Sequence, residues 1–369
     1  MVIRKNVNHL WLSGKLGVSS YKDYLPEKGF LLTILIALIV FVLLPASPVY
    51  AQFNSRPDNG IPAFNATEIL SRLSHNVSGA YENSALGFKI NFPQGWSGIE
   101  ANVMVNFVQV SPSGISPDKI ASQFQNQSVS ISITGIPKAM LELAMPLVSA
   151  FKMNDSTLFG NSSLMDITEN VKQFANCKLI SSSIIKLNKI ITEEKTNECS
   201  PGGQYVKTKS YDFATEKGIV TISYSANSQR DYNFYLPKFD ESIKSLTVSE
   251  PADVRTFGQE LLGVTSNSFD VKLPGAVLTI RIDSTQNVSN FSFNPLEKVI
   301  TFTTNAGKGI FGIAESRISI GKLLNGPYSV VMDGNKVEDF VTIDDMIDNG
   351  TVLDLTHPQG LHTFVISGK

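Results

Sequence analysis

Hydrophobic and polar positions divide the chain into one long apolar run near the N-terminus and a much longer remainder of short alternating segments. The run, Phe30–Leu44, is 15 residues long and uncharged, with five basic and two acidic residues before it and small residues at Val49 and Ala51 after it. A basic segment, an apolar core and a small-x-small site are typical of a secretory signal. We therefore predict that residues 1–51 are a signal peptide or, if uncleaved, an N-terminal membrane anchor.

The apolar segment leaves both outcomes open. The 23 largely apolar residues Gly29–Ala51 are long enough to span a bilayer at about 1.5 Å per residue. In either case the basic flank stays inside and the C-terminal 318 residues are exported. We expect a cell-membrane protein with a single N-terminal span and its C-terminus outside, or a secreted protein. The formal net charge of the chain is -2, which argues against a nucleic-acid partner. The exported part has 26 basic and 31 acidic residues, a net charge of -5, as is suitable for an extracellular domain.

Alternation of apolar and polar residues begins after residues 52–80, which we interpret as a tether containing one helix-like stretch, Ala66–His75. Within 81–249, alternation predicts strands and a spacing of three to four predicts helices. The predicted strands are Leu86–Phe92, Val103–Pro112, Ser128–Gly135, Leu179–Lys189, Gln204–Tyr211 and Gly218–Ser225, and the predicted helices are Met140–Met153 and Tyr235–Leu246. These layers predict an α+β fold, an antiparallel sheet with flanking helices.

Two segments of this region resemble the PsbP family, the extrinsic photosystem II protein and its relatives. They are Tyr81-Glu-Asn-Ser-Ala-Leu-Gly-Phe-Lys-Ile-Asn-Phe-Pro-Gln-Gly-Trp96, and the strand Gly218–Ser225 followed by Tyr235-Leu-Pro-Lys-Phe-Asp-Glu-Ser-Ile-Lys-Ser-Leu246. The resemblance covers about 81–249 and implies a central antiparallel sheet between helices. It transfers no metal ligand and no photosynthetic role to this chain, because the family acts through docking partners whose contact residues cannot be placed here.

A polar connector, residues 250–266, leads to a second region, 267–369, in which strand signals recur at short spacing. The nine predicted strands are Phe269–Leu273, Val277–Ile282, Asn290–Phe293, Val299–Thr303, Arg317–Ile320, Tyr328–Met332, Val337–Ile343, Val352–Leu355 and Thr363–Ile366. Asp333-Gly334 between two apolar runs is typical of a hairpin turn. So many short strands predict an Ig-like antiparallel β-sandwich.

This second region also resembles the C-terminal β-sandwich modules of secreted archaeal proteins. The resemblance rests on Phe291-Ser-Phe293, Leu323-Leu-Asn-Gly-Pro-Tyr-Ser-Val330, Asp333-Gly334 and His357-Pro-Gln-Gly-Leu-His362. It implies an exported, surface-exposed setting without an assigned catalytic activity.

Cysteine usage and glycosylation sequons agree with export. Cys177 and Cys199 are the only cysteines, and in an oxidising compartment we expect them to form a disulfide, with two free buried thiols as the alternative. Eight Asn-x-Ser/Thr sequons are candidate N-glycosylation sites. They are Asn65, Asn76, Asn126, Asn154, Asn161, Asn287, Asn290 and Asn349.

Two motifs that could carry chemistry are better explained structurally. Gly307–Gly312 matches G-x-G-x-x-G, but β-pattern surrounds it, so we interpret it as a glycine-rich loop and not as a dinucleotide site. His357 and His362, with Asp354 nearby, are fewer ligands than a zinc site needs, and we interpret them as turn and strand residues.

Acidic residues suggest two further candidate sites, one for calcium and one for glycoside hydrolysis. The cluster Asp339, Asp344, Asp345, Asp348 and Asn349 misses the spacing of an EF-hand loop, so we expect a solvated edge, with an irregular calcium site as the alternative. Glu193 and Glu194 are adjacent and point to opposite sides of a strand or helix, so they do not form a glycosidase pair. No Ser–His–Asp or Cys–His arrangement is recognisable in the sequence.

The sequence thus predicts an exported, non-enzymatic protein that acts at the cell surface through protein–protein or envelope contacts. It predicts no catalytic residue, no cofactor and no metal site, and it does not identify the partner. An extracytoplasmic module that binds a small ligand or a cation such as calcium is the alternative, and a hydrolase with an unrecognised site is a third hypothesis.

Overall fold

The computed structural model describes residues 74–369 except 103–104, 118–126, 143–176, 201–203, 258, 260–262, 306–312, 322 and 339. Several predictions therefore lie outside the described residues: the signal or anchor with Phe30–Leu44, most of the helix Met140–Met153, the loop Gly307–Gly312, Asp339, and the sequons at Asn65, Asn126, Asn154 and Asn161. Among the residues that are described, no helix is long and apolar enough to cross a membrane.

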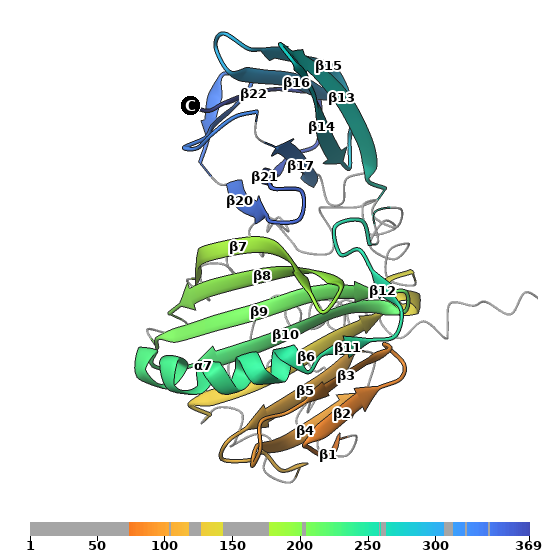
Figure 1. The fold of residues 1–369 in the computed structure, drawn as a ribbon, viewed down its shortest axis with the longest axis vertical. Helices are drawn as coiled ribbons and strands as arrows, with labels where there is room; N and C mark the ends of the chain where they lie inside the picture. The colour runs from red at the N-terminus through yellow and green to blue at the C-terminus, as the bar shows by residue number, and fades with distance from the viewer. Residues whose placement is uncertain are drawn as a thin grey trace, which may run out of the picture. The chain divides into compact units, whose positions relative to one another are not determined.

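The described residues of 74–252, here called the N-terminal half, are mostly β-strand (Figure 1). The strands are β1 (Ser74–Ser78), β2 (Ala80–Asn83), β3 (Phe88–Asn91), β4 (Ser97–Asn102), β5 (Asn106–Ser111), β6 (Val129–Pro137), β7 (Cys177–Leu187), β8 (Ile190–Cys199), β9 (Val206–Thr215), β10 (Gly218–Ala226), β11 (Thr247–Val248) and β12 (Pro251–Ala252), and the helix α7 is Gln229–Lys244. Eight strands follow the order β1-β4-β5-β6-β10-β9-β8-β7, each antiparallel to its neighbours, while β11, β3 and β2 form a small sheet.

Each strand predicted in this half overlaps an observed one, but β1, β2, β4, β8, β11 and β12 were not predicted. The sequences of β4 and β8 place the charged residues Glu100 and Glu193 at positions that are buried in the structure, so no clean alternation marks these two strands. β1 lies in the segment predicted as a tether, and His75 is in this strand and not at the end of a helix. The strands of the sheet therefore begin earlier than the sequence pattern indicates.

Helix α7 begins at Gln229, six residues before its predicted start. The hydroxyl of Ser228 accepts a hydrogen bond from the backbone N–H of Asp231 at 3.0 Å, which satisfies one of the free donors of the first turn. This cap starts the helix before the apolar spacing begins. Of the other predicted helix, Met140–Met153, only residues 140–142 are described, and they are helical.

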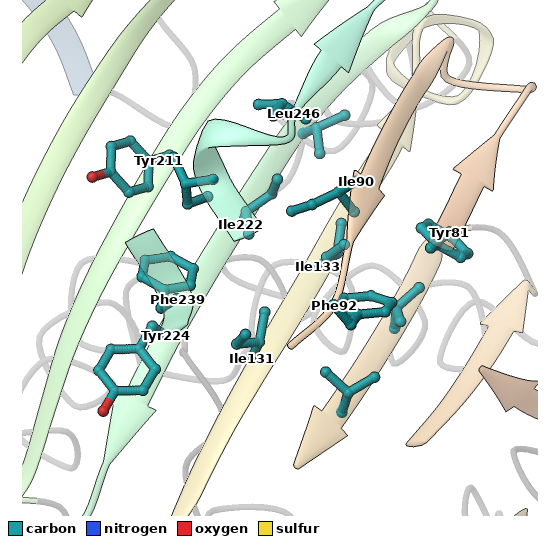
Figure 2. Packing of buried hydrophobic residues seen from close by; sticks show 14 of the residues in the cluster. Tyr81, Ile90, Phe92, Ile131, Ile133, Tyr211, Ile222, Tyr224, Phe239 and Leu246 are labelled. Atoms are coloured by element: carbon teal, nitrogen blue, oxygen red, sulfur yellow. The ribbon is translucent and has the colours of Figure 1, made fainter. Parts of the chain in front are cut away.

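One face of α7 packs on the sheet and closes the main core (Figure 2). Phe239 is fully buried, with its ring 5.2 Å from that of Tyr224 and 5.8 Å from that of Tyr211. At the other end of the core, Leu86 lies over the two glycines Gly135 and Gly218 of β6 and β10, where added Cβ atoms would come within 2.1 and 2.7 Å of its methyl groups. The glycines thus make room for one leucine.

Residues 265–369, here called the C-terminal half, are also mostly β-strand. The strands are β13 (Thr265–Leu273), β14 (Ala276–Ser284), β15 (Asn287–Asn294), β16 (Val299–Asn305), β17 (Ile313–Gly321), β18 (Ser329–Met332), β19 (Asn335–Val337), β20 (Phe340–Asp345), β21 (Gly350–Pro358) and β22 (His362–Ser367). They form two series, β20-β21-β17-β14-β13 and β15-β16-β22-β18-β19. A two-residue parallel pairing of β20 with β7 links the first series to the strands of the N-terminal half.

All nine strands predicted here overlap observed strands, although the predicted Val337–Ile343 is divided between β19 and β20. The hairpin at Asp333-Gly334 is confirmed: both residues have positive φ, and the turn joins β18 to β19. Side chains from both series meet in one core, in which Phe302 and Phe364 stack at 5.0 Å. The two ends of the predicted connector lie in strands, since β12 pairs with β9 and β13 begins at Thr265.

Candidate functional site

Helix α7 presents an aromatic side chain to solvent on the face opposite the core. Phe234 is 67% exposed, and its ring meets the ring of Tyr235 edge-on at 4.8 Å. Tyr235 in turn makes an edge contact at 5.7 Å with Trp96, which is buried. The exposed ring is therefore supported by aromatic side chains that continue into the core.

Two basic residues stand four positions on either side of Phe234. Arg230 and Lys238 are both exposed, and a spacing of four places them on the same helical face as the phenylalanine. The ammonium group of Lys238 lies 5.5 Å from the centre of the Tyr235 ring. We call Arg230, Phe234, Tyr235 and Lys238 the α7 patch, an aromatic surface with one basic residue on each side along the helix.

A second cluster lies in the C-terminal half, where a chain of polar side chains runs from Ser284 of β14 to Asp333 (the "polar chain"). Ser284 Oγ and Ser316 Oγ are 2.9 Å apart, and Ser316 Oγ is 2.9 Å from Nε2 of His357. The ring of His357 is 6.1 Å from that of His362, whose Nδ1 is 2.6 Å from the carboxylate of Asp333. Strands far apart in the sequence thus bring these five residues together.

The hydrogen-bond partners determine which atom is the donor in each contact of the polar chain. Nδ1 of His357 lies 2.9 Å from the carbonyl oxygen of Pro358, which can only accept, so Nδ1 carries a proton. Burial, and in smaller part the neighbouring His362, lowers the pKa of His357, which favours the neutral ring. Nε2 of the neutral ring then accepts from Ser316, and the oxygen of Ser316 accepts from Ser284.

The hydrogen bond from Ser316 to His357 is arranged like that between a catalytic serine and its general base. A serine hydroxyl that donates to a neutral imidazole is the first requirement of nucleophilic catalysis. Ser316, however, has no exposed surface, and His357 is only 4% exposed. A substrate carbonyl cannot reach this hydroxyl in the folded structure, so the pair is better explained as part of a buried hydrogen-bond network.

Within the described part of the chain, three polar atoms at this end of the C-terminal half are buried without a hydrogen-bond partner. They are both side-chain atoms of Gln286 and Nε2 of His362. The backbone N–H of Gln286 donates to Ser284 Oγ, which joins this residue to the polar chain. Unpaired buried polar atoms are uncommon in native proteins and are often explained by a bound water or ion.

The histidines and acids predicted as metal candidates do not converge. His357 and His362 are neighbours, but Asp354 is engaged elsewhere, accepting hydrogen bonds from Arg317 at 3.0 Å. No group of three or more His, Cys, Asp or Glu side chains suited to a metal ion is present in the described part of the chain.

The acidic cluster of the C-terminal half already holds a positive charge. Arg255 reaches Asp345 at 3.3 Å and Asp348 at 2.7 Å, and its other donors bind Asp253. Asp344, by contrast, is exposed. A guanidinium in this place competes with calcium for the carboxylates and makes an ion-pair cluster the simpler explanation.

Other predicted residues have clear positions. Cys177 and Cys199 form a disulfide between facing residues of β7 and β8. Glu193 and Glu194 lie on opposite faces of β8: Glu193 pairs with Lys195 and Glu194 with Lys209. The described sequons Asn76, Asn287, Asn290 and Asn349 are all exposed.

Sequence reasoning missed a buried carboxylate in the N-terminal half. Glu100 is 7% exposed and receives hydrogen bonds from Tyr81, Asn102 and Asn106, while His75 lies 2.8 Å from its other oxygen. These residues come from four strands. The only sequence signal was an acid between the apolar residues Ile99 and Ala101.

A cavity of about 410 Å³ lies beside strands β14, β17 and β21. Its lining includes the guanidinium groups of Arg255, Arg281 and Arg317. Each is ion-paired: Arg255 as described above, Arg281 with Asp283 at 2.7 Å, and Arg317 with Asp354 at 3.0 Å. The cavity therefore offers an anionic ligand no unpaired guanidinium.

Comparison with known proteins gives limited guidance. The sequence matches no protein family and no curated protein. Similar solved structures include a crystal structure from Bacteroides thetaiotaomicron VPI-5482, at 12% identity and a TM-score of 0.26 over 53% of this chain and 54% of that one. They also include the solution structure of cyanobacterial PsbP (CyanoP) from Synechocystis sp. PCC 6803, at 13% identity and a TM-score of 0.26 over 52% of this chain and 99% of that one.

The match with the Bacteroides protein spans about half of that protein's length. Both likenesses are weak structural similarities without a family match.

Proposed function

We propose that the chain is an exported, non-enzymatic cell-surface or secreted protein that binds a protein partner through the α7 patch. The proposal includes a PsbP-like α+β N-terminal half, an Ig-like antiparallel β-sandwich as C-terminal half, and a signal peptide or membrane anchor at Phe30–Leu44. It also includes N-glycosylation at exposed sequons. The apolar run, the cysteine pair and the sequons support export.

The observation that carries the binding role is the exposure of Phe234. A large aromatic side chain that is 67% exposed keeps apolar surface in water, at a cost of about 25 cal/mol per Å². Aromatic and arginine residues are enriched among the side chains that dominate binding energy at protein interfaces. Contacts with Tyr235, which itself packs on Trp96, already restrict the Phe234 side chain. Phe234 would therefore lose less conformational entropy on binding.

The border of the patch indicates the charge of the partner. Arg230 and Lys238 flank the ring, so an acidic protein surface with an apolar recess fits the patch. Such a contact weakens with rising salt concentration, because exposed charges are screened.

Site-specific crosslinking in the native host tests this role. The full chain is produced there with a photoreactive phenylalanine analogue at position 234, and we expect one discrete crosslinked product. We expect the product to be lost when Arg230 and Lys238 are both changed to Glu. Leu296, which is 94% exposed in the C-terminal half, is the matched control position and should give no discrete product. Equal yields at the two positions would reject the α7 patch.

A second candidate function, a small-ligand or cation-binding module, is favoured by the unpartnered atoms beside the polar chain. Nδ1 of His362 is held by Asp333, which leaves the buried Nε2 as a lone-pair donor of the kind that metal ions bind. Zinc should then raise the unfolding midpoint of the full chain but not that of His362→Ala. An unchanged wild-type midpoint excludes zinc at this position. The third hypothesis, a hydrolase, has weaker support than the binding module, because Ser316 is buried and a substrate cannot reach it.

A further inference from the structure

Strand β13 is an edge strand with an unpaired side. It ends the series β20-β21-β17-β14-β13 and pairs along its full nine residues with β14 alone (Figure 1). Among the described strands, none pairs with the backbone N–H and C=O groups on its other side. Long exposed edges of this kind are templates for pairing with another chain, and proteins normally block them.

The edge strands β1, β15 and β19 differ from β13. β1 carries the exposed sequon Asn76, and β15 carries Asn287 and Asn290. β19 is only three residues long. A glycan or a short strand hinders edge-to-edge pairing, whereas β13 is long and has no sequon.

The charges on β13 are complementary to those of a second copy of itself. Asp270 and Lys272 are two residues apart, so both side chains lie on one face of the strand, and both are exposed. When two copies pair antiparallel about Val271, Asp270 of each copy stands opposite Lys272 of the other. Shifting the axis to Asp270 would place the two aspartates opposite each other, and like charges in that position are destabilising.

The same register matches apolar residues on the other face of the strand. Residues 269–273 of each copy overlap, and Phe269 of one copy stands opposite Leu273 of the other. Both side chains are partly buried against the core of the C-terminal half, and Phe269 stacks on Phe291 at 4.3 Å. Pairing would therefore cover the side of this core that borders the free edge.

We infer that the chain forms a two-fold symmetric dimer in which β13 pairs antiparallel with β13 of a second copy about Val271. The occupant of the edge is a second copy because the Asp270 and Lys272 pair is self-complementary. This contact is independent of the α7 patch, since it involves none of the same residues.

Charge reversal tests the register directly. The full chain is measured in detergent by sedimentation velocity, and the wild type is expected to contain two copies per particle. Asp270→Lys places lysines opposite one another, and Lys272→Asp places aspartates opposite one another, so each variant should raise the dimer dissociation constant at least about tenfold. An equimolar mixture of the two variants restores both opposite-charge pairs and should form dimers again.

The control is Lys336→Glu on β19, where Lys336 and Glu338 form another exposed pair two residues apart. This variant should stay dimeric, and all variants should keep the wild-type circular dichroism spectrum. A monomeric wild type overturns the dimer. Single variants that remain dimeric, or a mixture that stays monomeric, overturn the register about Val271.

Discussion

Glu100 illustrates how single residues of this chain depend on their partners. An unpaired carboxylate in a protein core is costly, because burial removes its hydration. Here Tyr81, Asn102 and Asn106 donate to one oxygen at 2.7–2.8 Å, and His75 lies beside the other. Burial and the bond to Glu100 raise the pKa of the Tyr81 hydroxyl, so the tyrosine remains a donor well into the alkaline range.

Removing the Tyr81 hydroxyl tests this network. Tyr81→Phe leaves Glu100 short of one donor and removes an acceptor of Asn83 and Asn106, so we expect a loss of about 1–3 kcal/mol in the free energy of unfolding. Urea titration with an unchanged m-value measures it. Tyr205→Phe, whose hydroxyl bonds an exposed glutamine, is the matched control and should cost less than about 0.5 kcal/mol. Equal losses in both variants would contradict the network.

The buried His357 predicts a dependence of stability on pH. Its pKa is lowered in the folded state by burial, so the unfolded chain binds the proton more readily. Its contribution is therefore complete above the ordinary histidine pKa of about 6.5 and is lost as the pH falls through the lower folded value. We expect the difference in unfolding free energy between wild type and His357→Gln to shrink between pH 7 and pH 5. A difference that is constant with pH would exclude a neutral, buried His357.

At the scale of elements, alternation located most strands but failed where tertiary ion pairs replace apolar contacts. β8 reads Ile-Ile-Thr-Glu-Glu-Lys-Thr-Asn-Glu-Cys, with charges on both faces. Glu193 and Lys195 on one face form ion pairs that include Asp212 of β9, and Glu194 on the other face pairs with Lys209. These partners belong to a neighbouring strand, so no local pattern could have identified β8.

The packing of Leu86 against β6 provides a test at this scale. A Cβ at position 135 would lie 2.1 Å from a methyl group of Leu86, so Gly135→Ala should lower the free energy of unfolding by about 1–3 kcal/mol. In a Leu86→Ala background the same change should cost much less, because the clash is gone. A double-mutant cycle by urea unfolding measures the coupling. Additive effects would show that Leu86 does not determine the glycine at position 135.

For the whole molecule, the compartment and the disulfide are linked. The Cys177–Cys199 bridge joins adjacent strands and closes a segment with a sequence separation of 22 residues. Such bridges persist in oxidising compartments, which is consistent with the predicted export.

Removing this bridge should weaken the fold measurably. For Cys177→Ser with Cys199→Ser we expect a loss of about 3 kcal/mol in the free energy of unfolding, since the unfolded chain gains loop entropy. The wild type should lose a similar amount when a reductant is added before urea unfolding. The double variant should not respond to the reductant. A wild type that is insensitive to reduction would contradict the stabilising role.

The sequence alone determined the local features: the long apolar run, the number and position of most strands, the Asp333-Gly334 hairpin and the cysteine pair that the structure joins. Each of these depends on a periodicity, a turn preference or a count that is written in neighbouring residues. Tertiary structure decided which strands are neighbours. It thereby brought Ser284, Ser316 and His357 together, enclosed Glu100 and left β13 at an edge. Those outcomes depend on contacts between residues far apart in the chain, whose free energies no local pattern records.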